Sequence, residues 1–354
     1  MKIVVTGGAG FVGSNLAIFL KENISNSELV CLDNLKRRGS ELNLPVLKSR
    51  DIEFIHGDIR NPEDLSAIDH ADFIIDASAE ASVLAGIQSP VYPLINTNFN
   101  GTIHLLELAK KRNSRVIFLS TSRVYPIEAL NDIRWTEETT RFSIQENQSL
   151  PGVSVNGINE DFSLKGSRSF YGSSKLASEL FIEEYMAYGG VKAIVNRCGV
   201  IAGPGQMGKV DQGVLTLWVA RHFWKKELSY IGFSGSGKQV RDILHIDDLK
   251  ELILRQIVNF EKCSGQLFNI GGGKENTISL AELTRICQTV TSNKTVIRKI
   301  KENREADIRT YITDNSRITE RLDWNPAKSV QATVEDIFSW LAANESSLKP
   351  ILGQ

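Results

Sequence analysis

A tyrosine and a lysine four residues apart are the pair in this sequence best suited to move a proton. Tyr171-Gly-Ser-Ser-Lys175 stands at the start of a predicted helix over 171–188, and one helical turn puts both side chains on the same face. With an ordinary pKa of about 10, a tyrosine is a poor base at neutral pH. A neighbouring lysine cation stabilises the phenolate and lowers that pKa toward the working range. The pair therefore predicts a general base.

A hydroxyl that could act beside this pair comes from Phe118-Leu-Ser-Thr-Ser-Arg-Val-Tyr125, at the end of a predicted strand. Thr121 best fits the group that hydrogen-bonds to a substrate oxygen and orients it. Ser120 and Ser122 stay open as alternatives, and any of the three could instead satisfy backbone groups at the strand end.

A glycine-rich turn predicts a dinucleotide site. Gly7, Gly10 and Gly13 directly follow an apolar strand and open a helical pattern. Such a turn lets the backbone approach a pyrophosphate, which free N–H groups at the helix start can bind. Asp33 follows about 20 residues after Gly13, where an acidic side chain accepts both ribose hydroxyls of NAD. A bound nicotinamide cofactor would also suit Lys175, which can hydrogen-bond to its ribose.

The residues after Asp33 leave two interpretations of the cofactor. Lys36, Arg37 and Arg38 could attract the 2′-phosphate of NADP, or they could form a solvated basic loop. We favour NAD, because Asp33 would repel that phosphate; Asp58, after the next strand, is where an adenine contact would fall. The predicted cofactor-binding residues are Gly7, Gly10, Phe11, Val12, Gly13, Asp33, Asn34, Asp58, Ile59, Ala77, Tyr171 and Lys175.

The elements that position these residues alternate between strands and helices. Apolar runs predict strands over 3–6, 28–32, 52–56, 73–76 and 115–120, and helical spacing predicts helices over 11–22 and 92–111. This alternation predicts an α/β fold with a Rossmann-type, doubly wound parallel sheet, to which 192–197 and 266–270 add later strands.

Two parts of the chain lack this alternation. The polar stretch 128–168 has no clear period and is predicted to form surface loops. The irregular sequence from Gly199 onward, with a helix near 213–225, predicts a smaller C-terminal lobe over the carboxyl ends of the strands, where ligands bind in such sheets.

The composition excludes several classes of function. With 354 residues and a formal net charge of −1, the chain has no electrostatic footprint for nucleic acid or for an anionic membrane. The four cysteines have neither CxxC nor metal-ligand spacing, so we expect reduced thiols and no metal. No apolar run approaches a membrane span and nothing resembles a signal peptide, which favours a cytoplasmic protein.

With these motifs in place, the chain resembles the extended short-chain dehydrogenase/reductase family, which includes nucleotide-sugar epimerases and dehydratases. The resemblance runs from Met1 to about Pro326 and includes Asn98-Phe-Asn-Gly-Thr102, Arg241-Asp-Ile-Leu-His245 and Arg304-Glu-Ala-Asp307-Ile-Arg309. Within the family, the chain is most similar to the epimerases that invert carbon 2 of a CDP-linked hexose. The segments 33–39, 139–142, 211–213 and 235–242 carry this narrower resemblance.

The resemblance implies an NAD-dependent epimerase. Tyr171 would take a proton from a sugar hydroxyl while hydride passes to NAD, and the ketone would take hydride back on its other face. It also implies a substrate site, with Arg241 and Arg304 on the diphosphate and Asp307 on the nucleotide ribose. The predicted substrate-binding residues are Ser122, Arg123, Asp211, Gln212, Arg241, Arg304 and Asp307.

Several of the substrate residues also have a structural alternative. Arg241 and Arg304 could form surface ion pairs with Asp242 and Asp307, and Asp211 with Gln212 could simply cap a helix. The implied domains are an NAD-binding domain over 1–198, to which 239–271 returns, and a nucleotide-sugar-binding lobe over 199–238 and 272–354. Helices 92–111 and 171–188 match the pair that builds the homodimer in this family.

Three departures from the family pattern narrow the chemistry. Ser122-Arg123 stand where 4,6-dehydratases carry Asp-Glu, which argues against dehydration, and Val200 stands where 4-epimerases carry Asn. Asp76 begins a segment that replaces the usual His-x-Ala-Ala, and the sequence assigns it no role. The alternatives are a nucleotide-sugar 4-epimerase, an NAD(P)H-dependent reductase and a non-catalytic NAD-binding regulatory protein.

Overall fold

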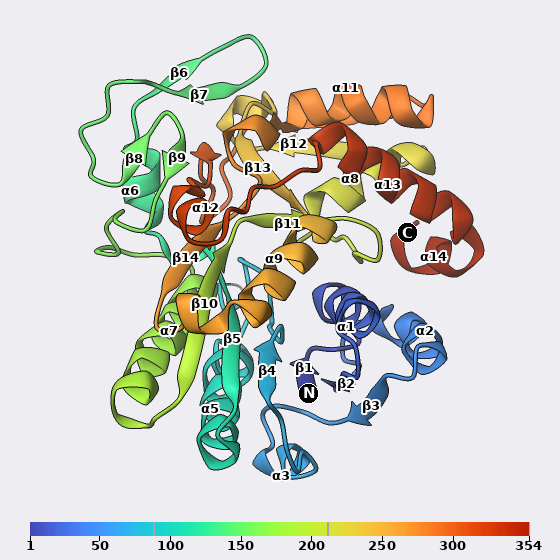
Figure 1. Cartoon of the computed structure of the whole chain (residues 1–354). Coiled ribbons are helices and arrows are strands. Elements are labelled where there is room, and N and C mark those ends of the chain that lie inside the picture. Colours follow the sequence, from blue (N-terminus) through green and yellow to red (C-terminus); the bar gives the residue numbers. More distant parts are fainter. Residues whose placement is uncertain (88, 211, 354) are drawn as a thin grey trace. The chain divides into compact units, whose positions relative to one another are not determined.

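The computed structural model describes residues 1–87, 89–210 and 212–353 (Figure 1). The chain forms two compact units. Unit 1 comprises Met1–Val124, Phe170–Arg197 and Lys250–Phe268. Unit 2 comprises Tyr125–Ser169, Cys198–Leu249 and Asn269–Gln354. Because it includes Tyr125–Ser169, it has about as many residues as unit 1.

Unit 1 is built on a seven-stranded sheet with the order β14-β10-β5-β4-β1-β2-β3 (Figure 1). The pairs β1–β2, β1–β4, β2–β3 and β4–β5 are parallel, as the alternation of strands and helices predicts. The strands are β1 (Lys2–Thr6), β2 (Glu28–Asp33), β3 (Glu53–His56), β4 (Phe73–Asp76), β5 (Arg115–Thr121), β10 (Lys192–Cys198) and β14 (Leu267–Ile270). This is the predicted Rossmann-type fold, and Asp33 and Thr121 are the last residues of their strands.

Both faces of the sheet are buried. Val4, Ile74 and Val116 belong to the large apolar cluster on one face. Their neighbours along the strands, such as Val5 and Ile75, point to the opposite face and are buried as well. The helices of unit 1 are α1 (Phe11–Asn23), α2 (Leu44–Ser49), α3 (Pro62–Leu65), α4 (Tyr92–Ile95), α5 (Gly101–Arg112), α7 (Phe170–Tyr188) and α10 (Phe260–Cys263), and most of α9 (Ile246–Val258) also belongs to this unit.

The predicted helix over 92–111 is present, but its hydrogen bonding changes in the middle. A π-helical segment, Asn96–Asn100, joins α4 to α5 without a break. Such segments often mark functional sites, because the wider turn leaves backbone carbonyls for other donors.

Unit 2 has a four-stranded sheet and three two-stranded ones. Its strands are β11 (Val200–Ala202), β13 (Val240–His245), β15 (Thr277–Ser279) and β17 (Thr310–Tyr311) in the larger sheet, then the pairs β12 (Leu228–Ile231) with β16 (Ile297–Ile300), β6 (Trp135–Glu137) with β7 (Phe142–Ile144), and β8 (Val153–Ser154) with β9 (Gly157–Ile158). Its helices are α6 (Ile127–Asn131), α8 (Val214–Phe223), α11 (Leu280–Thr291), α12 (Ser316–Leu322), α13 (Val330–Ala343) and α14 (Glu345–Leu352).

The prediction of surface loops over 128–168 holds for most of this segment but missed its short regular elements. This segment contains α6 and two hairpins, whose strands of two or three residues are too short to show a period of two. Contacts within unit 2 stabilise them: the Phe142 N–H donates to the Lys238 carbonyl, and the Ile158 N–H donates to the Ile312 carbonyl.

The boundaries of the units also differ from the expected domains. Residues 125–169 fold with unit 2, whereas the sequence analysis assigned them to the NAD-binding domain. The strand β13, expected to return to that domain, pairs instead with β11, β15 and β17. Among the helices of the described chain, none is both long and apolar enough to cross a bilayer.

Candidate active site

The glycine-rich turn lies where the order of the strands reverses. β1 lies between β2 and β4, and the chain continues to opposite sides of the sheet from this point, which is where ligands bind in doubly wound sheets. Gly7 has a left-handed backbone (φ 64°), and a Cβ there would lie 2.8 Å from the Ala77 carbonyl oxygen at the end of β4. A Cβ on Gly13 would lie only 2.2 Å from the Gly7 carbonyl oxygen.

The turn fits a pyrophosphate. The N-cap residue of α1 is Gly10, which has no side chain to cap the helix, and the first turn of α1 carries no acidic residue. The N–H groups of Phe11 and Val12 at this positive helix end therefore face no competing carboxylate from their own helix. The glycines at 7, 10 and 13 thus form a cradle that a dinucleotide can enter.

Asp33 lies beside this turn at the end of β2. Its carboxylate accepts hydrogen bonds from the N–H groups of Ala9 (3.1 Å) and Leu35 (2.8 Å). Burial raises the pKa of the Asp33 carboxyl, while these backbone hydrogen bonds act in the opposite direction. An acceptor held this close to the glycine turn suits the hydroxyls of a ribose.

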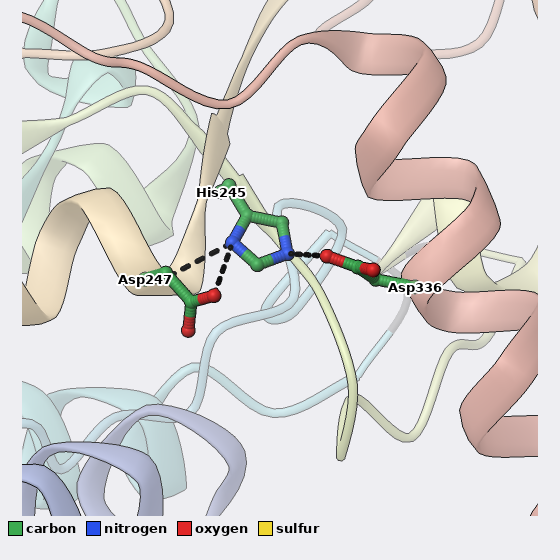
Figure 2. Close-up of side chains that lie close together, drawn as sticks. All are labelled: His245, Asp247 and Asp336. Carbon is green, nitrogen blue, oxygen red and sulfur yellow. Dashed lines mark hydrogen bonds and ion pairs between the residues drawn. The ribbon is translucent and has the colours of Figure 1, made fainter.

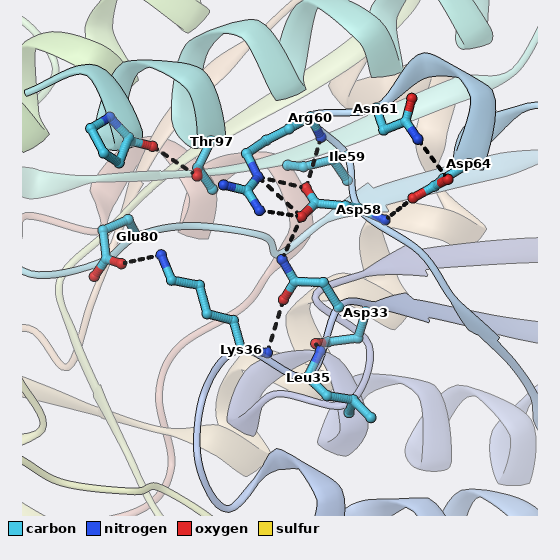
Figure 3. A network of polar contacts seen from close by, with 12 residues as sticks. Asp33, Leu35, Lys36, Asp58, Ile59, Arg60, Asn61, Asp64, Glu80 and Thr97 are labelled. Carbon is cyan, nitrogen blue, oxygen red and sulfur yellow. Dashed lines mark hydrogen bonds and ion pairs between the residues drawn. The ribbon is translucent and has the colours of Figure 1, made fainter.

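Asp58 lies near Asp33 (Figure 3), and Asn34, the residue after Asp33, contacts Asp58. The amide of Asn34 donates to the Asp58 carboxylate at 2.8 Å. Arg60, which the sequence analysis missed, binds the same carboxylate through Nε and Nη2 and holds the pKa of Asp58 well below its usual range. The spacing Asp58-Ile59-Arg60 was visible in the sequence, but nothing in it indicated this pairing.

The basic residues after Asp33 have a partner of their own. Lys36 Nζ lies 3.5 Å from the Glu80 carboxylate, so an acidic group offsets its charge (Figure 3). This contact agrees with NAD rather than NADP, because a 2′-phosphate gains less from a lysine that is already paired.

Asp76 now has a structural role. Its buried carboxylate accepts hydrogen bonds from the hydroxyls of Thr6 (2.9 Å) and Thr102 (3.2 Å) and from the Ser78 N–H. It therefore joins the end of β1 to α5 from the end of β4. The predicted cofactor residue Ala77 follows it, with its carbonyl against Gly7.

The three predicted catalytic residues are all buried and lie on packed elements. Thr121 (7% exposed) ends β5, and α7, which carries Tyr171 (9%) and Lys175 (1%), packs against β5 and against the turn that follows it. Lys175 Nζ lies 3.8 Å from the centroid of the Phe118 ring, which is a cation–π contact. The Thr121 hydroxyl oxygen accepts the Arg123 N–H at 3.2 Å.

The alternative hydroxyl at Ser120 is already engaged, because it donates to the Glu179 carboxylate. This favours Thr121 as the group that meets a ligand. Ser122 and Arg123, predicted to bind substrate, follow in a half-buried 3-10 turn (Ser122–Val124) of unit 1.

Asn98 links the π-helical segment to α7. Its amide donates to the Ser174 hydroxyl at 3.1 Å, and its backbone carbonyl accepts the hydroxyls of Ser178 (3.0 Å) and Thr102 (2.8 Å). Since Ser174 lies between Tyr171 and Lys175 in sequence, these bonds help to fix the helix that carries both.

The residues predicted for the nucleotide come together in unit 2. β13 pairs with β17, which brings Arg241 beside the segment 304–311, and Arg241 Nη2 donates to the Ile308 carbonyl at 2.9 Å. Arg304 Nη2 lies 3.3 Å from Asp307 Oδ1, so the ion pair considered as its alternative role is present. Asp242, the alternative partner of Arg241, is instead fully buried and accepts the Gly273 N–H.

Several residues around this group were missed. A Cβ on Gly232 would lie 3.0 Å from Asp307 Oδ2, and the next residue, Phe233, donates its N–H to the Asn303 side chain at 2.7 Å. The Arg309 guanidinium lies 4.9 Å from the Trp135 ring centroid and 5.5 Å from that of Phe233. These residues come from irregular segments or from elements of three residues, where periodicity gives no signal.

The last two predicted substrate residues precede α8. Asp211 lies outside the described residues. Gln212 donates its N–H to the Lys209 carbonyl (3.2 Å), and the N-cap of α8 is Gly213, with φ 75°, so Gln212 does not cap the helix.

A histidine between two carboxylates is the one cluster of possible metal ligands found among the described residues (Figure 2). Its two ring nitrogens face different carboxylates: Nδ1 of His245 lies 3.5 Å from Asp247 and also accepts that residue's N–H, while Nε2 lies 3.4 Å from Asp336. The Lys328 ammonium lies 2.9 Å from Asp336 and supplies a cation. Burial lowers the pKa of His245, and its Nδ1 accepts an N–H, so the main ion pair of this cluster is the one between Lys328 and Asp336.

Comparison with known proteins places this architecture in a family. The NAD dependent epimerase/dehydratase family matches residues 3–271. CDP-paratose 2-epimerase from Salmonella typhi is 32% identical over 97% of this chain and 100% of its own length. A dTDP-glucose 4,6-dehydratase from Streptomyces venezuelae, solved as a double mutant with NAD bound, has a TM-score of 0.81 at 26% identity and covers 99% of this chain and 100% of its own.

A further solved structure shows the same fold. UDP-glucuronic acid 4-epimerase from Bacillus cereus, in complex with UDP-glucuronic acid and NAD, has a TM-score of 0.79 at 23% identity over 97% of this chain and 99% of its own. Given the glycine cradle, the acidic residue at the end of β2 and the match over most of its length, the chain belongs to the NAD-dependent epimerase/dehydratase family and has NAD as its cofactor.

Proposed function

We propose that this protein is an NAD-dependent epimerase that inverts carbon 2 of a CDP-linked hexose through a transient ketone. The observation that carries the proposal is its similarity to CDP-paratose 2-epimerase along the whole of both chains. The resemblance of the segments 33–39, 139–142 and 235–242 to such enzymes supports the same substrate class.

Thr121, Tyr171 and Lys175 divide the proton chemistry between them in this proposal. Tyr171 removes the proton from the hydroxyl of the carbon to be inverted, and Lys175 stabilises the phenolate. Thr121 hydrogen-bonds to the reacting oxygen and orients it. NAD, when bound, accepts hydride from that carbon and returns it. Tyr171 and Lys175 are almost completely buried, so bulk water is kept away from the phenol group that receives the substrate proton.

The substrate residues suit a nucleoside diphosphate linked to a sugar. Two guanidiniums, Arg241 and Arg304, can bind the diphosphate oxygens, and Asp307 can accept hydroxyls of the nucleotide ribose. Ligand binding would exchange the Arg304–Asp307 contact, which is half-exposed, for contacts with the nucleotide. Ser122, Arg123, Asp211 and Gln212 are proposed to face the sugar.

We also propose a homodimer formed by α4, α5 and α7. Large apolar side chains of α4 and α7 are exposed in the single chain, among them Tyr92, Leu180 (54%), Phe181 and Tyr188. The helices α4 and α7 pack against each other within unit 1, so these side chains lie on neighbouring elements. Exposed apolar patches of this kind mark protein–protein interfaces.

The experiment is an incubation of the purified protein with CDP-, UDP- and GDP-hexoses in deuterated water, followed by NMR of the products and mass spectrometry of the denatured protein. Inversion at carbon 2 of the CDP-hexose, no deuterium at that carbon and stoichiometric NAD on denaturation are expected. Deuterium at the inverted carbon would show proton abstraction from carbon and refute hydride return. Inversion at carbon 4, or turnover only with added NADPH, would favour the 4-epimerase or the reductase.

A further inference from the structure

A buried ion pair connects α7, the helix that carries Tyr171 and Lys175, to the strand β10. Glu179 of α7 and Arg197 of β10 are 2% and 4% exposed. Arg197 donates from Nε to both Glu179 carboxylate oxygens (3.2 and 3.1 Å) and from Nη2 to Oε2 (2.7 Å). Removing one partner of such a pair leaves an uncompensated buried charge, which is strongly unfavourable.

The Glu179 carboxylate connects three elements. Besides Arg197, it accepts the hydroxyl of Ser120, and Ser120 immediately precedes Thr121 at the end of β5. β5 and β10 are neighbours in the sheet. One carboxylate from α7 therefore holds the ends of two adjacent strands, and one of these strands ends in the hydroxyl proposed to meet the substrate.

The same carboxylate shares a helix face with the proposed base. Tyr171, Lys175 and Glu179 follow at intervals of four residues, which places them on one side of α7, and all three are buried. Arg197 from β10 and Ser120 from β5 bond to the Glu179 carboxylate, and Lys175 precedes Glu179 by four residues on the same face of α7. The buried Glu179 carboxylate is thus paired with one buried cation, Arg197, and shares a helix face with a second, Lys175.

We propose that the Glu179–Arg197 pair is a positioning element of the active site. It holds the face of α7 that carries Tyr171 and Lys175 against the ends of β5 and β10. Its negative and positive charges also offset each other, so that together they leave the pKa of Tyr171 nearly unchanged. The inference rests on the proposed role of Tyr171 as the base.

The pair has an electrostatic signature that a purely structural role lacks. Glu179→Gln leaves the Arg197 cation uncompensated, which favours the Tyr171 phenolate and lowers its pKa. Arg197→Met leaves the carboxylate uncompensated, which disfavours the phenolate and raises that pKa. Eight helical residues separate Tyr171 from Glu179, about 12 Å, and a unit charge at that distance shifts a pKa by about one unit at an effective dielectric constant near 20.

The test is a titration of Tyr171 in the NAD-bound protein without substrate. Phenolate absorbance is followed with pH, and the same titration of Tyr171→Phe is subtracted to remove the other tyrosines. We expect the pKa to fall by about one unit in Glu179→Gln, to rise by about one unit in Arg197→Met, and to return near the wild-type value in the double variant. Equal or absent shifts in the two single variants would overturn the proposal.

Arg197→Lys keeps the positive charge but loses the bidentate contact with the carboxylate. It therefore distinguishes the effect of the charge on the Tyr171 pKa from the effect of packing. Its Tyr171 pKa should stay near wild type even if its thermal stability falls. A rise as large as that of Arg197→Met would contradict the electrostatic role, and this comparison also serves if Glu179→Gln does not fold. Because the titration needs no substrate, its outcome is independent of turnover; unchanged turnover in Tyr171→Phe would instead refute the proposed function.

Discussion

Replacing Gly13 with alanine tests whether close packing or helix propensity governs the glycine turn. Gly13 lies inside α1, where alanine is normally favoured over glycine by about 1 kcal/mol. Its Cβ, however, would lie 2.2 Å from the Gly7 carbonyl oxygen and 2.8 Å from Gly8 Cα. The first distance is more than about 1 Å shorter than an ordinary contact, and both neighbours are backbone atoms that no side-chain rotation can move.

The expected result is a loss of both stability and cofactor affinity. Overpacking of this kind costs about 1–3 kcal/mol, which exceeds the gain in helix propensity, so the NAD-free protein should melt a few degrees lower. Moving the turn should also cost at least one charge-assisted hydrogen bond to the pyrophosphate, about 1.5–3 kcal/mol, and thus raise the Kd for NAD about 10- to 100-fold.

Gly10→Ala is the matched control for stability. Its Cβ would lie 3.1 Å from the same Gly7 oxygen, a distance that a shift of a few tenths of an ångström relieves, and its φ of −72° suits alanine. Calorimetry of the NAD-free proteins and titration with NAD should therefore separate the two variants in melting temperature. A melting temperature of Gly13→Ala at or above that of wild type would refute the packing argument.

Three further predictions follow from the other sites. Tyr171→Phe should lower turnover by about 10²–10⁴-fold while the protein retains NAD, as measured by product NMR and by the cofactor released on denaturation; loss of the cofactor would point to a binding role instead. Leu180→Lys should shift the protein toward monomer in sedimentation velocity, whereas Val258→Lys, at an exposed position on α9, should not; two unchanged sedimentation profiles would contradict the proposed interface. Burial alone would raise the pKa of Glu282, but hydrogen bonds from Arg141 and others lower it to about 2, so its stabilising effect is present above about pH 4.5 and is lost as the pH falls toward 2. The difference in melting temperature between Glu282→Gln and wild type should accordingly be largest at pH 7, fall to less than about half near pH 3 and become small only near pH 2. A difference as large at pH 3 as at pH 7 would contradict this linkage.

The sequence alone predicted the features that depend on local geometry. The apolar run 73–76, the helical spacing of 171–188 and the glycine intervals after β1 reflect the local geometry of strands, helices and turns, so they can be recognised without knowing what they pack against. For the same reason Asp33, at the end of its strand, was predicted to lie beside the glycine turn, and it does.

What the tertiary structure alone decided is which distant residues meet. The hairpins within 128–168 form because their backbone groups bond to Lys238 and Ile312, far along the chain. Asp76 joins β1 to α5, and the Glu179 carboxylate reaches a serine 59 residues away in sequence. Such partners are selected by sheet order and helix packing, and no interval in the sequence encodes them. The residue types that can do chemistry are therefore readable from the sequence, whereas the buried polar network that holds them becomes visible only in the folded chain.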